Sequence, residues 1–266
     1  MQAQDILKNN VLEKLQNNQV VSSMTVKLVR GIEIAQIAKS AGFDTIYIDL
    51  EHSAFSLETT SQICMAAMNI GIAPFVRVPS NSSEWISRVL DGGALGIIAP
   101  HISSKEEAKK VVSFAKFPPL GDRSAAGVLP HLQYRSFPAE KAYPALNRNT
   151  MVVVQFENMK ALENADEIMS VDGVDMVLIG SNDLTADMSI PGQYDHPRLK
   201  EAYAKTIEAC RKYGKFCGVG GLSSRPDLVS QFVAMGARYV STGTDLAFLM
   251  SAASEKAKQV NALNTV

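Results

Sequence analysis

Eight short runs of apolar, mostly β-branched residues recur along the chain, and most of each run is continuous. Continuous apolar runs are typical of parallel strands, which are buried on both faces of a sheet, whereas half-solvated strands alternate with polar residues. We therefore expect eight buried strands. They span residues 20–28, 44–50, 73–78, 95–100, 151–156, 174–180, 215–220 and 238–243.

Helical patterns fill the intervals between these runs. The segments 31–42 and 56–71 carry apolar residues at helical spacing, and both end at a glycine. Further helices are expected at 83–93, 104–116, 159–170, 196–214 and 224–236. Eight strands alternating with helices predict an α/β fold, the (β/α)8 TIM barrel. A doubly wound open sheet is the alternative, but its usual G-x-G-x-x-G sequence does not follow the first strand.

Two segments lie outside this alternation. Residues 1–16 are polar with apolar positions at helical spacing, which predicts an amphipathic N-terminal helix on a single domain, 1–266. Residues 117–150 are rich in proline and glycine and lie between the fourth and fifth strands. A long loop in a compact domain is usually functional. We expect it to follow a strand and to face substrate at the C-terminal rim, with a solvated excursion or an oligomer contact as the alternative.

Composition narrows the classes of partner. With 26 basic and 27 acidic side chains, the net charge of −1 gives no reason to expect nucleic acid or an anionic membrane. The sequence contains no apolar run of about 18 residues and no signal-peptide pattern at its N-terminus. Cys64, Cys210 and Cys217 show no C-x-x-C spacing, so we expect reduced thiols in a cytoplasmic protein.

Charged and amide side chains stand at the ends of several expected strands. Parallel barrel strands all end at one rim, so these side chains should meet there. Charged groups are seldom buried without partners, and their convergence indicates a site. The residues concerned are Asp49, Glu51, His52, Arg77, Gln155, Glu157 and Asp183.

Two of these acids suggest a metal site. Glu157 and Asp183, with Gln155 beside them, offer hard oxygen ligands that suit Mg²⁺ or Mn²⁺. The alternative is that Asp183 caps a turn and that Glu157 pairs with a lysine.

The other residues suggest acid–base and anion-binding roles. Arg77 presents a planar fork of donors that can bind a carboxylate or an enolate oxygen, unless it serves a structural salt bridge. His52 adjoins two acids, and an imidazole oriented by Asp49 suits a general base near neutral pH.

Several longer motifs carry a family resemblance. The matching stretches are DLEHS, FVRVP, RVLDGGALGIIAP, KFPPLGDRSAAG, VVVQFEN, IGSNDLTADM and GARYVSTGTDL, in that order. From about residue 20 to 250, the chain resembles the HpcH/HpaI family of metal-dependent (class II) 2-oxo-acid aldolases, which have pyruvate/phosphoenolpyruvate-type barrels. The family includes 4-hydroxy-2-oxoheptanedioate aldolase and 2-keto-3-deoxy-sugar-acid aldolases.

The resemblance implies a role for each matching residue. Glu157 and Asp183 would bind the divalent ion (Mg²⁺ or Mn²⁺, with Co²⁺ as a further option), His52 with Asp49 would be the acid/base, and Arg77 would bind the 2-oxo acid. The residues implied to line the substrate pocket are Gln155, the backbone amides of Ser181 and Asn182, Arg123, and Asp91, which relatives contribute across a subunit boundary. Relatives also form homo-oligomers, hexamers or trimers of dimers, that exchange their last helix.

The implied reaction is cleavage of a 4-hydroxy-2-oxo acid into pyruvate and an aldehyde through a metal-stabilised enolate. Gly180-Ser181 and Ser53 depart from the usual family pattern, so the aldehyde is not indicated. The same enolate could serve citrate-type condensation or oxaloacetate decarboxylation. A Schiff-base aldolase, with Lys27 as the nucleophile, and a non-catalytic binding barrel are further alternatives. His101 follows the fourth strand and could face the aldehyde, although a structural role is favoured.

Overall fold

The computed structural model describes residues 2–265 and contains a closed barrel of parallel strands in the order β1 to β8. The expected TIM barrel is therefore confirmed, and each strand lies within one or two residues of its expected place. The strands are β1 (Val21–Val26), β2 (Thr45–Asp49), β3 (Ala73–Arg77), β4 (Gly96–Ala99), β5 (Met151–Phe156), β6 (Met176–Gly180), β7 (Phe216–Gly220) and β8 (Tyr239–Thr244).

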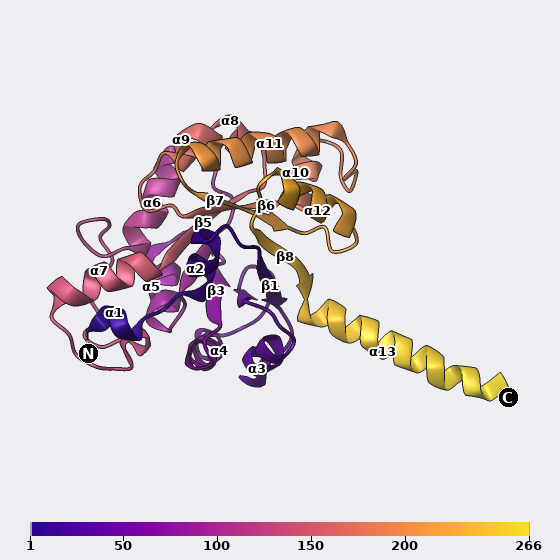
Figure 1. Ribbon diagram of the computed structural model, residues 1–266, viewed down its shortest axis with the longest axis horizontal. Coiled ribbons are helices and arrows are strands. Elements are labelled where there is room, and N and C mark those ends of the chain that lie inside the picture. The colour runs from indigo at the N-terminus through magenta and orange to yellow at the C-terminus, as the bar shows by residue number, and fades with distance from the viewer. Residues whose placement is uncertain (1, 266) are drawn as a thin grey trace.

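Helices surround the barrel, as Figure 1 shows. The expected helix at 159–170 is divided into two short helices at Asn164, and the expected N-terminal helix is also divided in two. The helices are α1 (Ala3–Ile6), α2 (Asn10–Gln16), α3 (Glu33–Ser40), α4 (Leu57–Asn69), α5 (Ser83–Asp91), α6 (Lys105–Ala115), α7 (Ala139–Asn149), α8 (Met159–Glu163), α9 (Ala165–Met169), α10 (Ser181–Asp187), α11 (Pro197–Lys212), α12 (Pro226–Met235) and α13 (Asp245–Asn261), with short 3-10 turns at Pro130–Leu132 and Ala262–Thr265.

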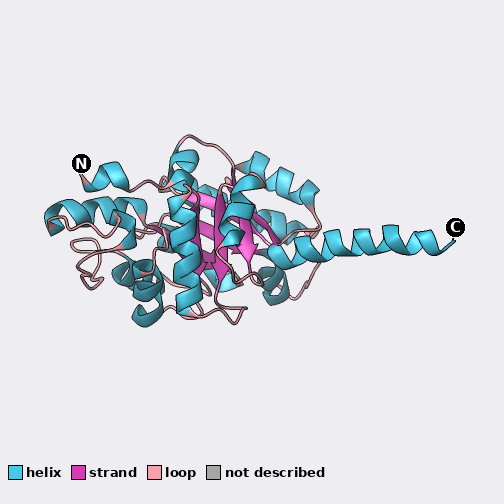
Figure 2. Cartoon of the chain, turned by 90° about the horizontal axis from the view of Figure 1, so that it is seen from below, coloured by secondary structure: helices cyan, strands magenta, loops and turns pink. Residues whose placement is uncertain are grey.

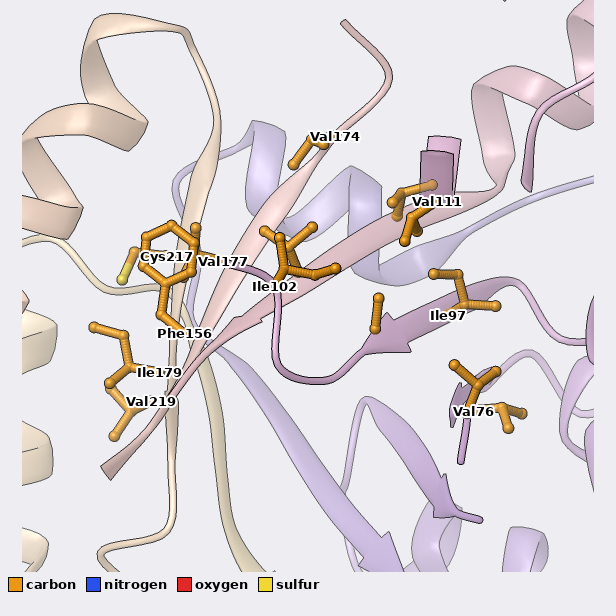
Figure 3. Packing of buried hydrophobic residues seen from close by; sticks show 14 of the residues in the cluster. Val76, Ile97, Ile102, Val111, Phe156, Val174, Val177, Ile179, Cys217 and Val219 are labelled. Atoms are coloured by element: carbon orange, nitrogen blue, oxygen red, sulfur yellow. The ribbon is translucent and has the colours of Figure 1, made fainter. Parts of the chain in front are cut away.

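The alternation of side chains along each strand separates two hydrophobic clusters. Outward-facing residues such as Val76, Ile97 and Val177 pack beneath the surrounding helices (Figure 3). Inward-facing residues such as Phe75 and Leu178 fill the barrel and join the N-terminal segment at its base. Toward the C-terminal ends of the strands, the inward-facing positions are occupied by polar residues. These polar residues therefore lie together at the C-terminal end of the barrel.

The segment 117–150 is not placed as expected. It follows α6 rather than a strand, so it lies at the N-terminal end of the barrel, and its second half forms α7. Leu129 and Leu132 pack in one cluster with Leu7 and Val11 of the N-terminal segment, and α1 contacts α7. The expectation of a loop at the substrate-facing rim was therefore wrong, because the intervening helix reverses the chain direction.

The last helix leaves the body of the molecule. Figures 1 and 2 show α13 projecting away from the barrel. Its first residue, Asp245, is buried and accepts hydrogen bonds of 2.8–2.9 Å from the backbone N–H groups of Lys27, Leu28 and Val29. The base of α13 is thus attached to the loop that follows β1. None of the described helices has the length and apolar character needed to cross a membrane.

Candidate active site

A cavity of about 380 Å³ opens at the C-terminal end of the barrel. Its walls come from the ends of β1, β2, β3, β5, β6, β7 and β8, so residues far apart in the sequence share one space. Most residues selected from the sequence line it. Those residues are Asp49, His52, Arg77, Gln155, Ser181, Asn182 and Asp183, and Lys27 lies with them.

Asp49 is the centre of a buried ion-pair network. It is a register partner of Arg77 on the neighbouring strand, and Arg77 donates to its two oxygens from Nε at 2.9 Å and from Nη2 at 2.7 Å. Lys27 Nζ lies 3.2 Å from the same carboxylate. Burial alone would raise the pKa of Asp49, but the hydrogen bonds and charges of Arg77 and Lys27 lower it below its usual value. Asp49 is therefore held as a carboxylate between two cations.

This geometry corrects one role expected from the sequence. Asp49 Oδ1 accepts hydrogen bonds from the backbone N–H groups of Glu51 and His52 at 3.1 and 3.2 Å. The expected orientation of the His52 imidazole by Asp49 was therefore wrong. In the described chain, the ring's ion-pair partner is Glu51, with Nε2 3.8 Å from Oε2, and 56% of the His52 side chain is exposed at the rim.

Glu51 connects the ion-pair network to the opposite wall. Its Oε2 lies 2.8 Å from Arg77 Nη1, and its Oε1 lies 2.9 Å from His101 Nε2. His101 Nδ1 in turn lies 2.9 Å from Glu157 Oε2. This chain of contacts could not be predicted from the sequence, because it depends on the spatial order of loops after three different strands.

Glu157 and Gln155 form the part of the site that fits a cation. Both side chains are almost fully buried, yet Oε1 of each has no hydrogen-bond partner among the described residues. A Cβ atom at Gly180 would lie 2.8 Å from Glu157 Cγ and 3.1 Å from Gln155 Nε2, so glycine is needed for them to fit there. Burial and the nearby charges of Glu51 and Asp183 raise the pKa of Glu157, although His101 opposes this shift.

Two carboxylates with a carbonyl oxygen are the ligands that Mg²⁺ or Mn²⁺ prefers. The buried, unpartnered oxygens of Glu157 and Gln155 and the repulsion between Glu157 and Asp183 are both relieved by a bound cation. No group of three or more His, Cys, Asp or Glu side chains within residues 2–265 is arranged as a metal cage. The oxygens of Glu157, Asp183 and Gln155 fit a divalent ion that would take its remaining ligands from water and substrate.

The start of α10 forms the adjoining wall. The backbone N–H groups of Ser181 and Asn182 belong to its first turn, where they have no partner within the helix. The Ser181 hydroxyl pairs with Tyr203 at 2.8 Å, and Tyr194 donates to Asn182 Oδ1 at 2.6 Å. These side-chain contacts hold the turn at the cavity wall, and its role in binding a substrate carboxylate stays a prediction.

Two expected substrate-binding residues do not reach this cavity within the chain. Asp91 ends α5 and accepts a hydrogen bond from Arg123 Nη2 at 2.6 Å. The Arg123 guanidinium is buried and stacks over Phe117 at 4.6 Å. Neither residue lines the cavity. The contribution of Asp91 across a subunit boundary and the role of Arg123 in substrate binding stay predictions.

Comparison with known proteins decides the family. The sequence profile of the HpcH/HpaI aldolase/citrate lyase family matches residues 30–252. The chain belongs to this family. The HpcH/HpaI chain is 37% identical over 256 residues, 95% of each protein, to a 4-hydroxy-4-methyl-2-oxoglutarate aldolase of Hapsidospora irregularis. The expected enzyme class, a lyase of the aldolase type, is thereby confirmed.

Two further relatives agree. This HpcH/HpaI protein is 30% identical over 240 residues to 2-keto-3-deoxy-L-rhamnonate aldolase of Escherichia coli, covering 90% of this chain and 88% of the relative. The crystal structure of an HpcH/HpaI aldolase from Desulfitobacterium hafniense DCB-2 superposes with a TM-score of 0.90 and 29% identity, covering 95% of this chain and 97% of that one. The family resemblance inferred from the motifs is confirmed.

Proposed function

We propose that this protein is a divalent-metal-dependent aldolase that cleaves a 4-hydroxy-2-oxo acid into pyruvate and a second carbonyl compound. The observation that carries the proposal is the pair of buried, unpartnered oxygens on Glu157 and Gln155, two side chains that lie against Gly180, close to the charge of Asp183. A divalent ion held by Glu157 and Asp183 would act as a Lewis acid that stabilises negative charge developing on the 2-oxo group. Mg²⁺ and Mn²⁺ fit these oxygen ligands best, and Co²⁺ is a further option.

The chain's own residues account for substrate positioning. The amides of Ser181 and Asn182 would bind the substrate carboxylate. Arg77 lines the cavity with its charge held in place by Asp49 and Glu51, and its remaining N–H groups would stabilise the developing oxyanion. Because Arg77 is buried and already oriented, it needs little reorganisation as charge develops on the substrate.

Proton transfer is assigned to His52 at the rim. Its imidazole would accept the proton of the 4-hydroxyl group as the C3–C4 bond breaks, and the bonding electron pair passes toward the 2-oxo oxygen. The hydroxyl-bearing carbon then leaves as the second carbonyl compound, and protonation at C3 gives pyruvate. Glu51, rather than Asp49, is the acid near the ring and would stabilise its protonated form.

The names of the relatives support this reaction over other enolate chemistry. A relative named 4-hydroxy-4-methyl-2-oxoglutarate aldolase shares 37% identity over nearly the whole chain. Condensation of the citrate type and oxaloacetate decarboxylation use the same enolate and are the alternative. The Schiff-base alternative is disfavoured because Lys27 is engaged with Asp49 at the cavity wall.

Hydrogen–deuterium exchange of the pyruvate methyl group tests the proposed enolisation. We expect exchange in the presence of Mn²⁺, its loss with EDTA, and its loss in Glu157→Gln. Glu163→Gln changes an exposed acid on the adjoining α8 and is the matched control, which should exchange normally. Exchange that survives EDTA but is abolished by borohydride added with pyruvate would refute the metal mechanism.

A panel of acceptors would then identify the reaction. Product formation from pyruvate and aldehydes or 2-oxo acids is expected, and a turnover confined to oxaloacetate or acyl-CoA acceptors would favour the alternative. No exchange and no turnover, with folded protein, would indicate a binding barrel.

We also propose that the protein is a homo-oligomer in which α13 packs on another copy of the chain. Leu246, Phe248, Leu249 and Met250 of this projecting helix are all more than 40% exposed. Large apolar side chains grouped on one exposed helix are typical of an interface. A hexamer or a trimer of dimers and a cytoplasmic location, which three buried free cysteines suit, remain predictions.

A further inference from the structure

His101 stands at an unusual backbone position beside the proposed metal site. It directly follows Pro100 after β4 and has a φ of 57°, in the left-handed region that non-glycine residues seldom adopt. In this conformation its backbone N–H donates to Glu157 Oε2 at 2.9 Å. Strain of this kind persists only where surrounding contacts stabilise it. Here those contacts are all with acids of the site.

Both nitrogens of the His101 ring lie against carboxylates. Nδ1 is 2.9 Å from Glu157 Oε2, the oxygen that also receives the backbone N–H, and Nε2 is 2.9 Å from Glu51 Oε1. The His101 side chain is 62% exposed, yet each ring nitrogen has a carboxylate beside it. Both ring nitrogens therefore lie against acids of the site, and a contact between His101 and the aldehyde stays a prediction.

The consequence for Glu157 is a carboxylate fixed by one oxygen. The backbone N–H of His101 holds Oε2 and ring Nδ1 lies against the same oxygen, while Oε1 is buried and has no hydrogen-bond partner in the described structure. A ligand carboxylate whose second oxygen is hydrogen-bonded is oriented for the metal, and such outer contacts affect metal affinity strongly.

We propose that His101 is a positioning residue that orients Glu157 as a metal ligand and ties it, through Glu51, to the segment that carries His52. This inference rests on the proposed metal-dependent function. His101 touches no reacting atom. It aligns the metal-binding wall with Arg77 and His52, because Glu51 contacts His101, Arg77 and His52.

Titration of the metal-free protein with Mn²⁺, followed by electron paramagnetic resonance, tests the inference without requiring turnover. His101→Gly keeps the backbone N–H and relieves the left-handed strain, so the fold is retained while the ring is lost. We expect its Mn²⁺ affinity to fall about tenfold to one hundredfold. His101→Asn tolerates the same backbone and can donate to Glu157, so it should recover most of the affinity.

A control variant and the affinity of the wild type separate a failure of this inference from a failure of the proposed function. His196→Asn changes a histidine that caps α11 away from the cavity, keeps a capping side chain, and should bind Mn²⁺ as the wild type does. If His101→Gly binds Mn²⁺ as tightly as the wild type, the positioning role is refuted. It is refuted too if His101→Asn binds as weakly as His101→Gly. If the wild type itself does not bind Mn²⁺, the proposed function fails instead.

Discussion

Replacing Asp49 with asparagine should destabilise the protein more than any other single charge removal at the rim. The carboxylate is fully buried, receives two hydrogen bonds from Arg77 and lies 3.2 Å from Lys27. Asparagine keeps the shape but removes the counter-charge of both cations. Breaking a buried ion pair from one side costs about 3–5 kcal/mol, and because Glu51 still faces Arg77 at 2.8 Å we expect about 3 kcal/mol.

Urea denaturation at a fixed protein concentration measures this loss. The control is Asp166→Asn, whose partner Lys212 lies at 2.7 Å with both side chains more than half exposed; solvent screening makes such a pair contribute little. Adding Lys27→Met to Asp49→Asn should recover part of the loss, because one uncompensated cation is removed. Equal destabilisation by Asp49→Asn and Asp166→Asn would refute the reasoning.

The dependence on pH gives a second check of the same ion pair. The pKa of Asp49 is lowered from 3.8 in the folded protein, so its ionised form stabilises the fold. That contribution is complete above pH 3.8 and is lost as the pH falls through the folded-state pKa below this value. The difference in unfolding free energy between wild type and Asp49→Asn should therefore be constant above pH 3.8 and shrink in stronger acid.

Three further changes test the remaining features. His52→Ala should slow aldol cleavage by about 100-fold or more and oxaloacetate decarboxylation much less, since only cleavage removes a hydroxyl proton; equal losses in kcat/KM would contradict this assignment. Gly180→Ala places a Cβ 2.8 Å from Glu157 Cγ. This overpacking should lower the unfolding free energy measured in urea by about 1–3 kcal/mol and weaken Mn²⁺ binding measured by calorimetry. Unaltered Mn²⁺ affinity would contradict the role of Gly180 in accommodating Glu157 and Gln155. Leu249→Glu should reduce the mass measured by light scattering, whereas Ser251→Glu on the other side of α13 should not; an unchanged mass for Leu249→Glu would remove α13 from the interface.

The barrel could be predicted from the sequence because its signals are local. Each strand is a short β-branched run, each is separated by a helical pattern, and the count closes the sheet without further information. The cavity residues followed from one additional rule, that parallel strands end at the same rim. That rule correctly placed Arg77, Gln155 and Asp183.

The partners of individual side chains could not be predicted in the same way. Asp49 and His52 are close in sequence, but the register of β2 and β3 brings Asp49 opposite Arg77. Cross-strand register is a long-range property, and nothing in the DLEHS stretch indicates it. The segment 117–150 was misplaced for a different reason: the helix expected at 104–116 precedes it, so its start at the N-terminal face could have been predicted from the sequence.

The charges around the cavity have a consequence for the order in which solutes can enter. Lys27 and Arg77 are balanced by Asp49 and Glu51, whereas Glu157 and Asp183 have no lysine or arginine ion-pair partner among the described residues. The metal-free cavity therefore carries a net negative potential and repels small anions, and a divalent ion has the charge that cancels it. A 2-oxo acid should consequently bind poorly to the metal-free protein whatever its side chain. Added salt should weaken this repulsion of anions by the metal-free cavity, because at physiological ionic strength it screens charges beyond about 8–10 Å.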